Sequence, residues 1–362
     1  MIKEIGSDFW LNRENIPYGK EVPLNFLGLK YLDAVLLSTG RSAISYVLDH
    51  IVSSKKTALL PPFTCYSVIE PFLNAGYEIH FYEIDERLEC NAHHLTKLVK
   101  EQDPSVVLFH SYFGFNTLKS VRETVKLIRD MGVVVIEDIT QTLYSKYNRL
   151  SADFYIGSFR KWGPHPDGGF AVSTSVTFKY KPEHVDLKLE EAKLKALHAK
   201  YLYMCEGKGE KTYFLQLFRE AEEILKSQRG YYAMSEVSRK VQDNLHINTL
   251  RKTRKQNYQQ LLEIAEDVND LVEPVFGSLP PEITPLYFPV YVKGNRKVLQ
   301  RLLAEQDIYC PIIWSKPKYC CGRVSETVNQ IYDSILAIPC DQRYGANEMN
   351  RIGEVLFQLQ KR

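Results

Sequence analysis

The stretch VVVIEDITQ, residues 133–141, joins a run of four apolar residues to two carboxylates and an amide. A short apolar run is typical of a buried strand, and ligands of open α/β sheets bind at the carboxyl ends of the strands. Two interpretations are open here. Glu137 and Asp138 end a strand, one of them capping the next segment, or a buried Asp138 pairs with the protonated ring nitrogen of a bound cofactor.

Short apolar runs alternate with longer amphipathic ones from about residue 35 to residue 175. This alternation is typical of β-α units that form a mostly parallel sheet, so we predict an α/β fold. The predicted strands are residues 57–60, 78–82, 106–110, 133–137, 154–157 and 170–173, and predicted helices include residues 41–52 and 118–131. Gly132 is a suitable C-cap for the second of these helices.

The sequence changes character after Val176. Long charged segments predict helices over residues 190–203, 214–226 and 236–267, with few apolar runs of strand length. The proline-rich junction LPPEITP, residues 279–285, then precedes a predicted strand over 287–292 and a helix over 296–305. We therefore predict a large domain, residues 1–235, with an N-terminal arm, and a small C-terminal α/β domain, residues 236–362.

Composition excludes several classes of protein. The 46 basic and 44 acidic residues leave a formal charge of +2 without a basic block, so we expect no nucleic-acid partner. The seven cysteines form no C-x-x-C pair, which favours reduced thiols and a cytoplasmic protein. With two acidic residues among the first ten and no apolar run of 18, we expect neither an export signal nor a membrane partner.

A lysine follows the next predicted strand, in the segment SFRKWGPHPDGG, residues 158–169. Lys161 at such a strand end can form an imine with an aldehyde, and the neighbouring cation Arg160 would lower its pKa and make it more reactive. The alternative is a solvated surface lysine. The combination with Asp138 distinguishes Lys161, because a lysine and an acid at one sheet edge are what pyridoxal 5'-phosphate (PLP) requires.

Two further segments could bind parts of such a cofactor. STGRSAI, residues 38–44, opens an amphipathic helix, and the free N–H groups at a helix start favour a phosphate, although any capped helix begins in this way. PPFTCYS, residues 61–67, follows a predicted strand, so Phe63 or Tyr66 could stack on a planar ring, unless they are core aromatics. His93 and His94 lack partners at ligand spacing, and we expect no metal site.

The order of these motifs resembles the DegT/StrS family of PLP-dependent, fold-type-I sugar aminotransferases. The resemblance extends over nearly the whole chain. It is carried by IGSDFW (5–10), TGRSA (39–43), residues 61–71 with GYE (76–78), HSYFG (110–114), EDITQ (137–141), SFRKWGPHPDGG (158–169), Asn257-Tyr258 and Ile338-Pro339. The implied fold is a mostly parallel central sheet flanked by helices, with a smaller C-terminal α/β domain.

The resemblance also implies roles for individual residues. Lys161 matches the lysine that binds PLP as an imine, and Asp138 matches the partner of the ring nitrogen. Other positions that match cofactor-binding ones are Gln141 at the ring, Gly40, Arg41, Ser42 and Ser158 at the phosphate, and Cys65 or Tyr66 as the stacking residue. Tyr112 falls in a substrate-side segment. Family members are homodimers with shared active sites, so we expect a homodimer.

The predicted activity is transfer of an amino group from an amino acid, with glutamate as the expected donor, to a keto sugar. The resemblance implies a nucleotide-linked acceptor and a place in cell-surface polysaccharide or secondary-metabolite biosynthesis. Arg343 could clamp the donor carboxylate, because a planar guanidinium suits bidentate binding, or it could be a surface arginine. Relatives with histidine in place of the lysine are dehydratases, so Lys161 favours transamination. The alternatives are another fold-type-I reaction, dehydration or a lyase step, and a non-catalytic PLP-fold binding protein.

Overall fold

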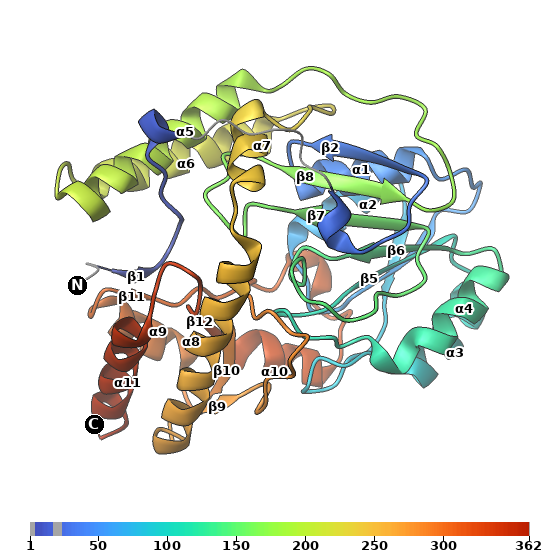
Figure 1. The fold of residues 1–362 in the computed structure, drawn as a ribbon. Coiled ribbons are helices and arrows are strands. Elements are labelled where there is room, and N and C mark those ends of the chain that lie inside the picture. Colours follow the sequence, from blue (N-terminus) through green and yellow to red (C-terminus); the bar gives the residue numbers. More distant parts are fainter. Residues whose placement is uncertain (1–3, 17–23, 362) are drawn as a thin grey trace. The chain divides into compact units, whose positions relative to one another are not determined.

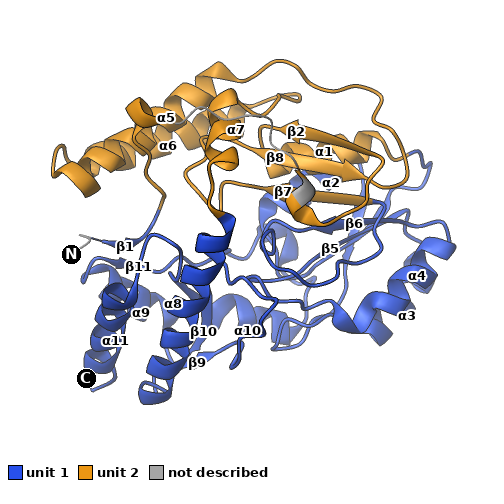
Figure 2. Ribbon diagram, viewed as in Figure 1, with its two compact units in different colours: residues 1–7, 52–153, 247–362 blue, residues 8–51, 154–246 orange. Residues whose placement is uncertain are grey.

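The structure is a computed structural model, which describes residues 4–16 and 24–361. The chain divides into two compact units built from interleaved segments (Figure 2). Unit 1 comprises residues 1–7, 52–153 and 247–362, and unit 2 comprises residues 8–51 and 154–246. The predicted boundary at residues 235/236 follows the sequence in a linear way and stays a prediction.

A parallel sheet lies in the N-terminal half of unit 1 (Figure 1). Its strands stand in the order β6-β5-β3-β4. They are β3 (Thr57–Leu60), β4 (Glu78–Phe81), β5 (Val106–His110) and β6 (Val134–Asp138), joined through the helices α2 (Tyr66–Asn74), α3 (Ala92–Gln102) and α4 (Arg122–Asp130). Every residue of β5 is buried, as expected for an apolar strand inside a parallel sheet.

The C-terminal part of unit 1 is a second α/β layer. Its strands β9 (Val272–Pro274), β10 (Phe288–Val292) and β12 (Ile335–Ile338) form an antiparallel sheet with β10 in the middle. Around it lie α8 (Ile247–Asp267), α9 (Arg296–Ala304), α10 (Glu326–Ser334) and α11 (Ala346–Gln360). The short strand β1 (Ile5–Gly6) pairs in parallel with β11 (Ile308–Tyr309), which ties the N-terminus to this layer.

Unit 2 contains three antiparallel strands in the order β2-β8-β7. They are β2 (Asp33–Leu37), β7 (Phe154–Ser158) and β8 (Gly169–Ser173), and α1 (Gly40–Asp49) packs on them. The remaining helices of this unit are α5 (Leu187–Tyr201), α6 (Lys211–Ser227) and α7 (Glu236–Asp243). α5 and α6 pack side by side as a hairpin (Figure 1) around a small core that includes Leu197 and Phe214.

The predicted α/β fold is confirmed, and the six predicted strands of residues 57–173 are β3 to β8 within a residue at their ends. The strands β2, β9 and β12 were not predicted. The predicted helix over 236–267 is wrong as a single element, because the chain breaks at residues 244–246 between α7 and α8. Asn244, the C-cap of α7, donates its amide N–H to the Lys240 carbonyl at 2.9 Å and so ends the first helix.

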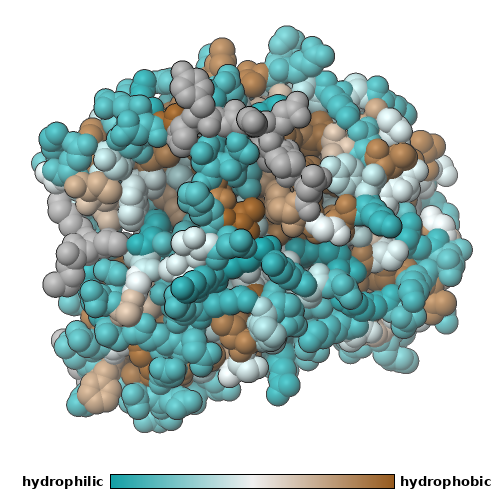
Figure 3. All heavy atoms as spheres, in the orientation of Figure 1, coloured by the Kyte–Doolittle hydropathy of each residue, from teal (hydrophilic) through white to brown (hydrophobic). Residues whose placement is uncertain are grey.

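The surface in Figure 3 is mainly hydrophilic, with hydrophobic side chains in small groups. Among the helices of residues 4–16 and 24–361, none is both long and apolar enough to span a bilayer.

Candidate active site

Lys161 lies on a tight turn that begins where β7 ends. The turn is fixed by its backbone: Phe159 donates its N–H to the Gly168 carbonyl at 3.1 Å, and Trp162 donates to the Phe159 carbonyl at 2.9 Å. The Trp162 side chain is fully buried, whereas Lys161 is partly exposed. The buried Trp162 side chain and these backbone bonds fix the place on the turn from which the Lys161 side chain extends.

Glycines let helix α1 start directly against this strand end. A Cβ on Gly169 would stand 2.4 Å from the carbonyl carbon of Thr39, and a Cβ on Gly40 would meet the Ser158 Cβ at 3.3 Å. Both contacts involve the start of α1, so only glycine at position 169 permits this close approach. The first turn of α1 therefore lies against the Ser158 side chain in unit 2. Ser158 precedes Lys161 by three residues.

The start of α1 is capped from within. The Thr39 hydroxyl oxygen accepts the Ser42 N–H at 2.9 Å and lies 2.8 Å from the Ser42 hydroxyl. The capping interpretation is therefore correct for Thr39, and Ser42 takes part in the cap. A cap uses only one of the N–H groups of the first turn, so the helix start retains its preference for anions. Ser158 donates its hydroxyl to the Gly168 carbonyl at 3.2 Å, and a phosphate would have to compete for it.

Arg160, the cation beside Lys161, faces an acid on α6. Its guanidinium lies 3.9 Å from the Glu222 carboxylate, which also accepts a hydrogen bond from Lys193 of α5. The Lys193 side chain is only 7% exposed. Burial and the Arg160 charge lower the pKa of Lys193, while Glu222 opposes this shift. The positive charge predicted to activate Lys161 is thus partly balanced by Glu222.

The far end of the lysine turn is pinned to α7 by a buried carboxylate. Asp167 accepts hydrogen bonds from the Ser235 N–H at 3.0 Å and from the Ser235 hydroxyl at 2.8 Å. Ser235 is the N-cap of α7, and Ser238 donates its hydroxyl to the Asp167 carbonyl at 3.2 Å. Burial raises the pKa of Asp167, and these donors oppose the shift. The turn is therefore closed at both ends, by β7 and by α7.

In unit 1, Asp138 ends β6 in register with His110 of β5. Its carboxylate accepts the Thr140 N–H at 2.8 Å, and the residue is partly exposed. The carboxylate therefore closes a local turn, as the capping interpretation predicted. It also lies at the carboxyl end of a parallel strand, where a partner of a cofactor ring would stand. No role of its own was predicted for His110. Its ring nitrogen lies 3.2 Å from the Thr64 hydroxyl at the same sheet edge. A histidine that ends an otherwise apolar run is the sequence pattern that indicates such a position.

The adjacent Glu137 has a different environment. It is buried, accepts the Leu150 N–H at 2.8 Å and lies 3.9 Å from the Arg149 guanidinium. Burial raises the pKa of Glu137 to about 7, against the opposing effects of Arg149 and the Leu150 hydrogen bond. Glu137 therefore stabilises the 149–150 segment, and Asp138 is the carboxylate at the accessible strand end.

Gln141 and Tyr112 are both buried and both bonded within unit 1. Gln141 accepts the Phe113 N–H at 2.8 Å, which supports a turn where Phe113 has a φ of +54°. Tyr112 is 1% exposed and donates its hydroxyl to the Phe63 carbonyl at 3.0 Å. The predicted substrate residue Tyr112 is thus a core residue in this structure. The side-chain oxygen of Gln141 stabilises the turn at Phe113 by accepting this hydrogen bond.

The segment 61–67 separates the two aromatic candidates. Phe63 is fully buried and packs against Tyr112, Trp314 and Tyr332, so it is a core aromatic. Tyr66 is 50% exposed at the start of α2. Cys65 is the N-cap of α2 without a side-chain cap, and its sulfur accepts a hydrogen bond from Ser67 at 3.1 Å. Tyr66 is therefore the aromatic of this segment that can reach a ligand.

The Arg343 guanidinium is already occupied. Its Nε and Nη2 donate to the two carboxylate oxygens of Asp341, each at 2.8 Å, and Nη2 also donates to the Ser7 carbonyl at 3.2 Å. The side chains of the pair are 10% and 5% exposed. The Arg343 side chain is therefore largely buried and paired with Asp341. A donor carboxylate would have to displace or share with Asp341.

Comparisons with solved structures define the class of fold. An aminotransferase of Helicobacter pylori, PseC, involved in pseudoaminic acid biosynthesis, matches with a TM-score of 0.72 and 15% identity, over 99% of this chain and 100% of that chain. A putative sugar aminotransferase of Streptococcus pneumoniae in its PLP form matches with a TM-score of 0.69 and 14% identity, over 99% of both chains. An Escherichia coli GDP-4-keto-6-deoxy-D-mannose-3-dehydratase with bound hydrated PLP matches with a TM-score of 0.64 and 15% identity, over 92% of this chain and 89% of that chain. The predicted fold, that of PLP-dependent aminotransferases, is confirmed.

The sequence itself supports a narrower statement. Residues 23–166 match the DegT/DnrJ/EryC1/StrS aminotransferase family, and this segment contains Gly40, Asp138 and Lys161. The predicted resemblance is thereby confirmed, and the predicted class of enzyme, an aminotransferase, is the one that the family match supports. No curated protein matches the chain.

Proposed function

We propose that the chain is a PLP-dependent aminotransferase that transfers an amino group from glutamate to the keto group of a nucleotide-linked sugar. The observation that carries this proposal is the arrangement at the end of β7, where a partly exposed Lys161 follows Ser158 and the start of α1 packs on the same strand end. A cytoplasmic homodimer that contributes to cell-surface polysaccharide or secondary-metabolite biosynthesis completes the proposal.

The residues at this strand end fit the phosphate of PLP. Gly40 and Arg41 stand in the first turn of α1, where backbone N–H groups and the helix dipole favour a dianion. Without a Cβ, Gly40 lets the start of α1 approach the Ser158 side chain, and the two would form a cradle for the phosphate. Ser42 would support this cradle through its contact with Thr39.

The residues of β6 and α2 fit the ring of PLP. Asp138 would accept a hydrogen bond from the protonated ring nitrogen and keep the proton on that nitrogen, because a carboxylate stabilises a neighbouring cation. Tyr66 would stack on the ring with Cys65 beside it, and Gln141 would reach the ring through its amide N–H, since its oxygen is engaged by Phe113.

When bound, PLP supplies an aldehyde carbon and a ring that accepts electrons. Lys161 would use its amine first as a nucleophile and then as a base that moves a proton of the substrate carbon, which requires a defined position such as the turn provides. The anchors of this turn, Trp162 and the Asp167–Ser235 bonds, would maintain the position of the amine. The reaction is balanced without an external oxidant, because the donor amino acid becomes a keto acid while the acceptor ketone becomes an amine.

Arg343 would bind the donor carboxylate only in competition with Asp341. If it does, the donor must replace one of the two 2.8 Å hydrogen bonds of the pair. Arg343→Lys should then raise the KM for glutamate and leave the KM for the acceptor unchanged, because the planar fork of arginine is lost.

Borohydride reduction followed by peptide mass spectrometry tests the central assignment. We expect a phosphopyridoxyl group on Lys161 and no adduct in Lys161→Ala, while Lys195→Ala, which removes a lysine of α5, keeps the adduct. An adduct on another lysine overturns the assignment, and a chain that binds no PLP favours a non-catalytic binding protein.

A glutamate half-reaction separates transamination from the alternative PLP reactions. Mixing the holoenzyme with glutamate should convert the cofactor to its aminated form and release 2-oxoglutarate, which absorbance and product analysis both detect. The test must separate transamination from dehydration, because one of the similar structures is a dehydratase. Failure with every amino donor excludes transamination and favours dehydration or a lyase step.

A further inference from the structure

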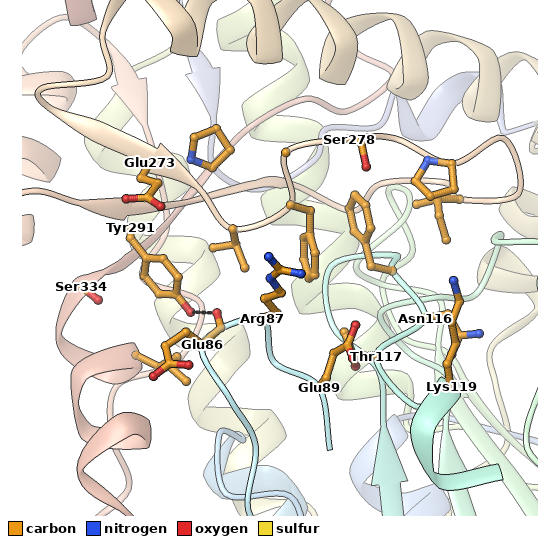
Figure 4. Close-up of a pocket in the computed structure, with 18 of the residues that line it drawn as sticks. Glu86, Arg87, Glu89, Asn116, Thr117, Lys119, Glu273, Ser278, Tyr291 and Ser334 are labelled. Carbon is orange, nitrogen blue, oxygen red and sulfur yellow. Dashed lines mark hydrogen bonds between the residues drawn. The ribbon is translucent and has the colours of Figure 1, made fainter. Parts of the chain in front are cut away.

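Unit 1 contains a pocket of about 790 Å³ that none of the residues predicted to bind PLP or substrate lines. Its walls come from the turn after β4, the segment after β5, the stretch from β9 to residue 283, and α10 (Figure 4). A pocket of this volume can take a ligand of several rings or a single ring with water. The lining includes Glu86, Arg87, Glu89, Thr117, Lys119 and Phe276.

One wall of the pocket is a fixed turn. The Asp85 carboxylate accepts the N–H groups of Arg87 at 2.9 Å and Glu89 at 2.8 Å, and Tyr291 donates its hydroxyl to the Glu86 carbonyl at 2.5 Å (Figure 4). The turn is also tied to the segment after β5, because Cys90 donates its N–H to the Thr117 carbonyl at 3.2 Å. The charged side chains of the turn therefore project from a defined backbone.

A second wall offers an aromatic face. The ring of Phe276 stacks on Phe115 with a centroid distance of 3.9 Å and an interplanar angle of 11°. Tyr258 donates its hydroxyl to the Phe276 carbonyl at 2.9 Å and fixes the backbone of this residue. Arg87, which Figure 4 shows on the turn after β4, lines the same pocket. The pocket thus combines an apolar ring with charged groups.

Four charged side chains of the lining have no side-chain partner within the described residues, whereas Glu273 pairs with Lys293. No ion pair or side-chain hydrogen bond joins Glu86, Arg87, Glu89 or Lys119 to another residue of the ranges 4–16 and 24–361. The Thr117 hydroxyl is buried, the residue being 2% exposed, and lacks a hydrogen-bond partner as well. Unmet hydrogen bonds of a buried hydroxyl cost free energy, which a bound ligand could recover.

Acidic groups outnumber basic ones in the lining. The carboxylates are Glu86, Glu89, Glu273 and Glu282, against the cations Arg87 and Lys119. An excess of carboxylates disfavours a free anion and favours an ammonium group, which the aromatic wall also attracts. Asn116, Ser278 and Gln330 add amide and hydroxyl groups that exchange hydrogen bonds with a polyol.

We propose that this pocket binds an aminated sugar. The ammonium group would lie at Glu89, the apolar face of the sugar ring on Phe276, and the ring hydroxyls at Arg87, Thr117 and the amides. The excess of carboxylates favours a ligand with an ammonium group, and the amide and hydroxyl groups favour a polyol. The identification of this ligand with the product class of the enzyme rests on the proposed function. Occupation by such a ligand would report product to the enzyme at a site other than Lys161.

Calorimetric titration of the borohydride-reduced holoenzyme with glucosamine tests the proposal. Reduction blocks the reaction of the amine with the cofactor, so binding at Lys161 does not contribute. Glucose serves as the neutral probe, and glutamate serves as a zwitterion without a sugar ring. We expect saturable glucosamine binding that is at least tenfold tighter than glucose binding.

Two variants and a control locate the site. Glu89→Gln should weaken glucosamine binding at least tenfold and leave glucose binding unchanged, and Phe276→Leu should weaken both. Glu123→Gln, which removes a carboxylate of α4 outside the pocket, should change neither. Equal glucosamine affinity in Glu89→Gln and the unaltered chain overturns the proposal, as does tighter binding of glutamate than of glucosamine.

The outcomes separate this proposal from the proposed function. A phosphopyridoxyl group on Lys161 without glucosamine binding overturns the pocket proposal alone. Glucosamine binding that Glu89→Gln abolishes, in a chain without a Lys161 adduct, overturns the proposed function alone. For a chain without a Lys161 adduct, glucosamine is titrated into the protein as purified, without borohydride reduction.

Discussion

Two adjacent carboxylates at the end of β6 have separate tasks because their surroundings differ. Glu137 points into the core, where Leu150 and Arg149 contact it, and Asp138 is partly exposed at the strand end. Successive side chains of a strand point to opposite faces, so the alternation itself assigns one acid to each environment.

Glu137 should make the stability of the protein depend on pH. Burial raises its pKa from 4.5 to about 7, so folding favours the protonated acid. The resulting stabilisation is complete below pH 4.5 and disappears as the pH rises through 7, and it amounts to up to about 3 kcal/mol. Denaturant unfolding of Glu137→Gln and the unaltered protein at pH 5 and pH 8 should show the variant gaining relative stability at pH 8. A difference that is the same at both values contradicts this assignment.

Gly169 should tolerate no side chain. Its Cβ would lie 2.4 Å from the Thr39 carbonyl carbon and 2.7 Å from the Gly40 nitrogen, which are backbone atoms that cannot rotate away. Gly169→Ala should therefore displace the start of α1, destabilise the fold by about 2 kcal/mol or more, and weaken PLP binding. Gly277→Ala, where nothing lies within 4 Å, is the control in thermal unfolding and PLP titration. Unchanged PLP affinity in Gly169→Ala would show that the start of α1 does not bind the phosphate of PLP.

The sequence predicted which residues stand at strand ends but not what their side chains bond. Lys161 and Asp138 were placed correctly at the ends of β7 and β6 because apolar runs locate strands. The Asp341 partner of Arg343 and the Phe63 carbonyl that binds Tyr112 come from segments that only the fold brings near. Hydrogen-bond partners distant in sequence leave no local pattern.

At the scale of elements, α7 acts as a clamp on the lysine turn. Ser235 caps α7 through the Ser238 N–H at 3.2 Å and also bonds the buried Asp167. Loss of an N-cap costs about 1 kcal/mol, and loss of the hydroxyl hydrogen bond to the Asp167 carboxylate, which keeps the N–H of residue 235, costs a further amount of about 1–3 kcal/mol. Ser235→Ala should therefore destabilise the protein more than Ser325→Ala, which removes the corresponding cap of α10.

The experiment compares the two serine variants by denaturant unfolding and by the rate of PLP loss. Faster PLP loss in Ser235→Ala alone indicates that α7 positions the turn. Equal effects of the two substitutions would show that both are ordinary helix caps.

The stability of the α5–α6 hairpin should depend on Glu222 more than on the neighbouring Glu223. Glu222 pairs with the buried Lys193 and lies 3.9 Å from Arg160, whereas Glu223 forms an exposed pair with Lys226 one turn along the helix. Glu222→Gln leaves Lys193 without its partner and should cost about 1–2 kcal/mol, less than a fully buried pair because Glu222 is half exposed. Glu223→Gln should cost no more than about 0.5 kcal/mol. Urea unfolding of both variants measures the difference, and equal values would place Lys193 in contact with solvent.

Elements with a uniform environment were predictable, and elements with a mixed one were not. β5 was predicted at its observed bounds because every residue is apolar or ends the run, and each is buried. β2 was not predicted although Asp33–Leu37 contains four consecutive apolar residues, of which only Val35 and Leu37 are buried. The break between α7 and α8 contains neither proline nor glycine, and only the Asn244 cap reveals it.

At the scale of the whole molecule, the sequence predicted the α/β class but not the interleaving of the two units. Each unit contains segments from distant parts of the chain: residues 8–51 join residues 154–246, and residues 52–153 join residues 247–362. A linear reading places boundaries where composition changes, and composition does not change at residues 51 or 153. Contacts between distant segments, which no local pattern encodes, define these units.

The oligomeric state provides the last prediction, since the family resemblance implies a homodimer with shared active sites. Sedimentation equilibrium should give twice the chain mass of 41.9 kDa. A site shared between two chains binds PLP only in the dimer, so PLP must strengthen dimerisation by linkage. The reduced holoenzyme should therefore remain dimeric at lower concentration than the chain freed of PLP. A monomer that retains full PLP occupancy after dilution would show that one chain supplies the entire cofactor site, and Lys161 and Asp138 would then act within the same chain.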